Sequence, residues 1–235
     1  MFFDPVYMVV IGICLVLSLL ASAGVKGTFA RYGKVTTRSG FTGAQVAQAI
    51  LQAHGIKDVT IEPIQGSLTD HYDPSSKTLR LSEPVYHSNS VAAVGVAAHE
   101  VGHAIQHAEG YAPLQFRSAW VPVAGIGSNL GIVLMVIAAM MGGFQKSPAM
   151  AWIGILVFAT TTVFTLVTLP VEFDASRRAL RTLESSRVLA SDELAGARSV
   201  LTAAALTYVA AFVSSLMTLL YWAYQLGLFG QRRND

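Results

Sequence analysis

Residues 91–108 read VAAVGVAAHEVGHAIQHA, an apolar run that ends in the motif His99-Glu100-Val101-Gly102-His103. In a helix, residues four apart share a face, so the two histidines lie one turn apart with Glu100 beside them. Two neutral imidazoles bind Zn²⁺, and a carboxylate can take a proton from a zinc-activated water. The same pattern also occurs by chance on surface helices without metal. Here the apolar run favours a metal site, because buried polar side chains need a partner.

Composition places part of the chain in lipid. Of its 235 residues, 53% are hydrophobic and 13% are charged, which is too apolar for an ordinary soluble domain. The net charge of +2 and the lack of a basic run with interleaved aromatics argue against a nucleic-acid partner. The single cysteine, Cys14, excludes an internal disulfide and lies in an apolar run, where it is expected to be a packing residue.

Four stretches are long enough to cross a hydrocarbon core of about 30 Å, which takes about 20 apolar residues in a helix. They cover residues 6–25, 121–142, 149–169 and 201–228. No lysine or arginine precedes the first stretch, and its apolar run is longer than that of a signal peptide. We therefore interpret it as a retained membrane anchor.

Basic side chains orient these spans, because lysine and arginine stay preferentially on the cytoplasmic side. Those that follow the first and third spans are Lys26, Arg31, Lys34, Arg38, Arg177, Arg178, Arg181 and Arg187. Only Lys146 lies between the second and third spans. Both longer polar segments are therefore expected in the cytoplasm, although Arg232 and Arg233 at the C-terminus oppose this orientation.

The order of polar and apolar segments predicts five regions. They are an anchor (1–25), a cytoplasmic metallopeptidase region (26–119), transmembrane helices two and three (120–169), a cytoplasmic helix (170–200), and the last transmembrane helix with a short tail (201–235).

Within the first polar segment, residues 43–51 have helical apolar spacing behind a cap-like Thr42. The short runs 59–62 and 78–82 are bounded by turn residues and predict a small sheet or hairpin. A strand just before the metal helix could take up an extended peptide as one more strand.

A catalytic zinc normally has three protein ligands and one open position, so the motif needs a third ligand. His107 lies about 12 Å along the helix axis from His99, too far to share a metal. A metzincin would need glycine and histidine where Gln106 and Glu109 stand, and the late Asp-Gly motif of site-2-type proteases is absent. Glu172 follows the third span on the side expected for the histidines. An acidic residue at the start of a solvated helix is also favourable by itself, so both interpretations of Glu172 remain open.

Four stretches of the chain together resemble the bacterial membrane-bound neutral zinc metallopeptidases of the YugP type. They are HEVGHAIQH (99–107), LPVEFDAS (169–176), DHYDP (70–74) and LSEPVYH (81–87). The match runs from near Phe41 to Ser176, and the hydrophobic layout extends it to the whole chain. This family is in turn distantly similar to HtpX-type and CAAX prenyl proteases, whose third ligand is the glutamate of Glu-x-x-Ala-Asp. That position falls on Glu172, whereas Ser176 replaces the aspartate.

The resemblance implies a mostly α integral membrane protein of the bacterial inner membrane, with a small α+β zincin-like unit in the cytoplasm. One Zn²⁺ would be held by His99, His103 and Glu172, and Glu100 would be the general base of peptide hydrolysis. Ser176 and Asp174 are candidates for orienting the ligands, with Asp174 expected on another side of the helix. Candidates for the oxyanion donor, which the sequence does not rank, are Tyr86, His87, His71 and Arg177.

Two other classes stay open. In a membrane scaffold or chaperone-like protein the zinc would be structural. Structural zinc sites usually have four protein ligands, rich in cysteine. A transporter receives little support from spans that lack buried acids, bases and paired broken helices. The expected partners are the lipid bilayer and a peptide or protein substrate that is membrane-attached, and the oligomeric state is not predicted.

Overall fold

A computed structural model of the protein describes residues 4–228, so Arg232 and Arg233 lie outside the described residues. Its contacts divide the chain into two compact units. The first, here the helical unit, comprises the chain up to Leu20, Phe116–Thr168 and the chain from Tyr208. The second, here the α/β unit, comprises Ala21–Gln115 and Leu169–Thr207.

Within the described residues, four helices are long and apolar enough to cross a membrane. They are α1 (Pro5–Tyr32), α5 (Ala112–Met140), α7 (Pro148–Ser185) and α8 (Ser191–Gln225), and the short α6 (Gly143–Lys146) lies between α5 and α7. The expectation of a mostly helical chain with about four membrane-length helices is therefore confirmed. None of the residues of α1 is buried, as expected for a helix whose sides face lipid.

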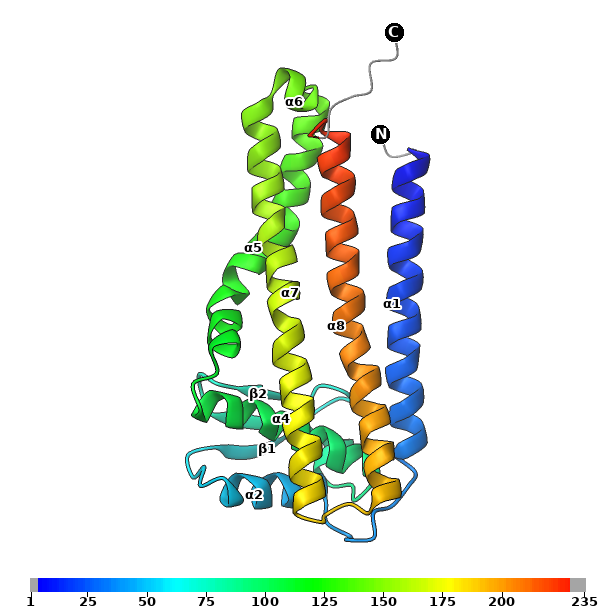
Figure 1. The fold of residues 1–235 in the computed structure, drawn as a ribbon, viewed down its shortest axis with the longest axis vertical. Helices are drawn as coiled ribbons and strands as arrows, with labels where there is room; N and C mark the ends of the chain where they lie inside the picture. Colours follow the sequence, from blue (N-terminus) through cyan, green and yellow to red (C-terminus); the bar gives the residue numbers. More distant parts are fainter. Residues whose placement is uncertain (1–3, 229–235) are drawn as a thin grey trace. The chain divides into compact units, whose positions relative to one another are not determined.

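In the helical unit, segments of these helices pack side by side (Figure 1). A Cβ at Gly131 of α5 would lie 2.7 Å from the Cα of Phe158 of α7, so the two backbones approach closely there. Small residues at such crossings are typical of membrane helices, which gain stability from close packing. Met135, Phe158 and Trp222 belong to the buried cluster of this unit.

The α/β unit contains a three-stranded sheet in the order β1-β3-β2. β1 (Thr60–Ile64) pairs parallel to β3 (Thr78–Ser82), and β2 (His71–Asp73) pairs antiparallel to β3. The expected small sheet is therefore confirmed. The expectation that the strand at 78–82 takes up an extended peptide is wrong, because β3 is the middle strand and both its edges are already paired.

Helix α2 (Gly43–Ala53) begins where the sequence predicts a cap. The Thr42 hydroxyl accepts from the Gln45 N–H at 3.3 Å, and Oε1 of Gln45 accepts from the Thr42 N–H at 2.9 Å. This reciprocal capping box satisfies two backbone donors that the first turn leaves unpaired. After β3, the short α3 (Glu83–Tyr86) leads into α4 (Val91–Ala108), which carries the histidine motif.

Helix α4 is the centre of the α/β unit. Its N-cap Ser90 accepts from the Ala93 N–H at 3.2 Å, and most of the helix is buried. A Cβ at Gly102 would lie only 2.6 Å from the carbonyl oxygen of Ala175 on α7. Glycine at this position therefore lets the backbones of α4 and α7 touch, and Figure 1 shows the yellow end of α7 beside α4. This contact positions the polar side chains that follow.

Candidate metal centre

Three side chains from two helices converge in the α/β unit. His99 and His103 of α4 have ring centroids 4.8 Å apart, and Glu172 comes from α7. Oε2 of Glu172 lies 3.2 Å from Nε2 of His99 and 3.6 Å from Nε2 of His103. One ligand atom of each residue lies within 4.8 Å of the other two. The structure thus brings together the three residues that the sequence and the resemblance single out.

Glu172 reaches the histidines because α7 continues as one helix past Pro170. Its neighbours Val171 and Ala175 are fully buried, and only 2% of the Glu172 side chain is exposed. A carboxylate at this depth requires positive charge or hydrogen-bond donors around it. Two imidazole nitrogens and one carboxylate oxygen form a set of the kind that catalytic zinc uses while a fourth position stays open. The residues present therefore fit a zinc ion.

The outer ring nitrogen of each histidine has its own partner. Nδ1 of His99 lies 3.1 Å from Oγ of Ser176, and Nδ1 of His103 lies 3.0 Å from Oε1 of Gln106. Partners of this kind fix the orientation of the rings. Ser176, which stands where the more distant relatives have aspartate, thus contacts the imidazole through a neutral hydroxyl.

Glu100 follows His99 directly on α4 and is buried, with 8% of its surface exposed. Its place on the helix is the one that the motif predicts, one step around from the ligand face.

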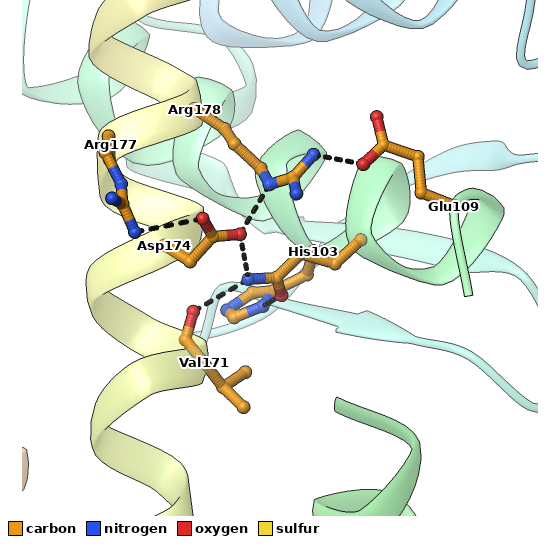
Figure 2. Close-up of polar contacts among 7 residues, drawn as sticks. His103, Glu109, Val171, Asp174, Arg177 and Arg178 are labelled. Atoms are coloured by element: carbon orange, nitrogen blue, oxygen red, sulfur yellow. Dashed lines mark hydrogen bonds and ion pairs between the residues drawn. The ribbon is translucent and has the colours of Figure 1, made fainter. Parts of the chain in front are cut away.

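Asp174 and Gln106 connect the two helices behind His103. Nε2 of Gln106 donates to Oδ2 of Asp174 at 3.0 Å and to the Val171 carbonyl at 2.9 Å (Figure 2). Although Asp174 is expected on another side of the helix than Glu172, both carboxylates contact side chains of α4, and Asp174 reaches His103 through the Gln106 amide. In the sequence, Gln106 stands out only as a mismatch to the metzincin motif. Its spacing, three residues after His103 on a buried helix face, is the signal that could have found it.

The four candidates for the oxyanion donor make contacts with residues outside the three-residue cluster. Nδ1 of His71 lies 2.8 Å from the Thr69 carbonyl, and the rings of Tyr86 and His87 pack edge to face at 4.8 Å. Nη2 of Arg177 donates to Oδ1 of Asp174 at 3.1 Å. The contacts of these side chains therefore give none of them a position against the metal ligands.

Two of the stretches that resemble the family, residues 70–74 and 81–87, contain β2 and the end of β3. The Ser82 N–H and hydroxyl both donate to Oδ1 of Asp70, at 2.7 and 3.0 Å, which joins the end of β3 to the start of β2. Burial raises the pKa of Asp70, and these hydrogen bonds offset part of that rise. The Tyr72 hydroxyl lies 2.8 Å from Nδ1 of His107, so this histidine serves to attach β2 to α4.

The fold and the site together define a membrane-associated protein with a buried two-histidine, one-glutamate centre. Residues 7–227 match the family described as "putative neutral zinc metallopeptidase". The chain belongs to this family, and the resemblance seen in the sequence is confirmed. It is 45% identical over 204 residues to the "putative membrane protease YugP" of Bacillus subtilis (strain 168), covering 87% of this chain and 89% of that protein. No solved structure matches the chain.

Proposed function

We propose that the protein is a membrane-embedded, zinc-dependent endopeptidase. The observation that supports this most strongly is the convergence of Nε2 of His99, Nε2 of His103 and a carboxylate oxygen of Glu172, with Glu100 adjacent on the same helix. Membership in a family of zinc metallopeptidases and the protease name of the Bacillus relative support the same reaction class.

His99, His103 and Glu172 would hold one zinc ion per chain. When bound, zinc supplies the Lewis acidity that activates water and polarises the scissile carbonyl. Glu100 accepts a proton from the attacking water and then donates it to the leaving amine, a contribution of about 10²- to 10⁴-fold to the rate. Ser176 and Asp174 hold the imidazoles in place, Ser176 directly and Asp174 through Gln106.

The centre faces the cytoplasm of a bacterial cell in this proposal. Its support is the basic charge that follows the first and third spans, since such residues are retained on the cytoplasmic side. Glu172 belongs to the same helix as the third span, so the centre is close in sequence to the membrane. Membrane-attached proteins are therefore the substrates that we expect, and equal cleavage of soluble and anchored versions of one peptide would contradict this.

Mass spectrometry of a diverse peptide mixture incubated with the purified, detergent-solubilised protein tests the proposal. The comparison samples are Glu100→Gln and the parent treated with a chelator. Cuts made only by the untreated parent would establish a metal-dependent peptidase and give its sequence preference. Zinc bound equally by both forms, without cuts in soluble or membrane-anchored peptides, would contradict the proposal and favour a structural metal.

A further inference from the structure

Gln106 is fully buried in α4, and its amide is surrounded by three polar groups. Nε2 donates to the Val171 carbonyl at 2.9 Å and to Oδ2 of Asp174 at 3.0 Å, while Oε1 lies 3.0 Å from Nδ1 of His103 (Figure 2). A buried amide of this kind uses its donors and its acceptor fully, so it stabilises one arrangement of its neighbours.

The partners of Gln106 determine which way its amide points. A carbonyl oxygen and a carboxylate oxygen on one side are both acceptors, so that side must carry the NH₂ group. The flipped amide would set its oxygen against two other oxygens and lose both hydrogen bonds. Oε1 therefore faces His103 and accepts a hydrogen bond from Nδ1–H. That tautomer leaves the lone pair on Nε2, the atom that points to Glu172.

We propose, on the basis of the function given above, that Gln106 is a positioning residue that prepares His103 for metal binding under the control of Asp174. Asp174 is itself clamped by two arginines: Arg177 donates to Oδ1 at 3.1 Å, and Nε of Arg178 donates to Oδ2. Arg178 also donates from Nη1 to Glu109 at 2.6 Å, beyond the end of α4. A chain of hydrogen bonds thus runs from Glu109 to the imidazole and links α4 to α7, and it is charge-assisted as far as the Gln106 amide.

The two histidines differ in this respect. The Ser176 hydroxyl beside Nδ1 of His99 can either donate or accept, so by itself it does not select a tautomer. Gln106 selects one for His103. We therefore expect the amide to contribute to metal affinity and not only to packing.

An exchange of the two polar groups tests this, with Zn²⁺ affinity measured by competition against a chromogenic chelator on the full-length protein in detergent. Gln106→Met removes the acceptor and should weaken zinc binding by about 10- to 100-fold. Gln106→Glu keeps the acceptor but sets a carboxylate against Asp174, so an intermediate loss is expected. Adding Asp174→Asn to Gln106→Glu removes the repulsion between the two carboxylates but leaves the Val171 carbonyl without its donor, so it should recover part of the affinity that Gln106→Glu loses. Gln48→Met, the same replacement on the exposed face of α2, should leave it unchanged.

The proposal is overturned if folded Gln106→Met binds zinc as tightly as the parent, or if the double exchange binds no better than Gln106→Glu alone. If Gln106→Met does not fold, the comparison of the zinc affinity of Gln106→Glu with that of the double exchange still tests the proposal. Because affinity is measured without peptide, the outcomes separate from those for the proposed function. A parent that binds zinc, responds to these exchanges and cuts nothing would refute the peptidase alone, and a parent that binds no zinc would refute both.

Discussion

The role of Glu172 depends on the three-dimensional structure, because Glu172 comes from a different helix than the two histidines. It is almost fully buried, and its Oε2 lies 3.2 and 3.6 Å from the two imidazole Nε2 atoms. Glu172→Gln keeps the size of the side chain but removes the negative charge that a divalent cation requires of this ligand set. We expect the purified variant to lose its zinc while the helices remain folded, as measured by metal content and circular dichroism. Glu184→Gln, on an exposed turn of the same helix, should keep one zinc per chain.

Asp70 gives the α/β unit a pH dependence with a defined sign. Burial raises its pKa above the ordinary value, so the folded state holds the proton more tightly than the unfolded chain does. The associated stability is present below the unfolded pKa of about 4 and is lost as the pH rises through the folded value. Asp70→Asn abolishes this titration. The unfolding midpoint of the metal-free parent should therefore fall relative to that of the variant as the pH rises from about 4.

Asp58 is a control for that measurement, because its pKa is shifted in the opposite direction. The hydrogen bond from Lys77 lowers the pKa of Asp58, so its contribution is present above the unfolded pKa and lost as the pH falls through the folded value. The curves of the parent and Asp58→Asn should thus diverge in the other direction. Identical pH profiles of the unfolding midpoint for the parent and Asp70→Asn would contradict a raised pKa of Asp70 in the folded state.

At the scale of elements, the contact between α4 and α7 is what assembles the centre. A Cβ at Gly102 would lie 2.6 Å from the Ala175 carbonyl, so Gly102→Ala must push α7 away and carry Glu172 with it. We expect a loss of about 1–3 kcal/mol in the free energy of unfolding, despite the better helix propensity of alanine, together with weaker zinc binding. Chemical denaturation and metal competition measure the two effects.

Gly95→Ala is the matched control on the same helix. Its Cβ would lie 3.2 Å from the Cβ of Ala197 on α8, a contact that a backbone shift of a few tenths of an ångström can relieve. Zinc affinity should remain that of the parent. Equal effects of the two alanines on zinc binding would show that general helix packing, and not the approach of α4 to α7, governs the centre.

The elements also show what the sequence can and cannot predict. The four long helices and the capped α2 follow from local patterns, namely apolar length and the Thr42–Gln45 pair. β2 was not anticipated because three residues are too few for an alternating pattern, and its pairing with β3 depends on contacts such as Asp70 to Ser82. The parallel pairing of β1 with β3 likewise has no local signature.

In the molecule as a whole, contacts between residues far apart in the chain are the hardest to predict from the sequence. His99, Glu100 and His103 can be recognised together because one helical turn fixes their spacing. From the residues alone, Glu172 has two interpretations, a metal ligand or an acidic residue at the start of a solvated helix. The resemblance to a family favours the metal ligand. The spacing within α4 points to the contact of Gln106 with His103, whereas its contact with Asp174 depends on how α4 and α7 pack.

We propose that the chain hydrolyses peptide bonds with a zinc ion held by this centre and with Glu100 as the base. The most direct measurement is the rate of cleavage of one membrane-anchored peptide by the metal-free protein during stepwise addition of zinc, beside Glu100→Gln. We expect the parent's rate to rise with zinc occupancy and to saturate at one zinc per chain, while the variant binds the same zinc and is about 10²- to 10⁴-fold slower. Cleavage that does not depend on added zinc, or that is equally fast in Glu100→Gln, would contradict this proposal.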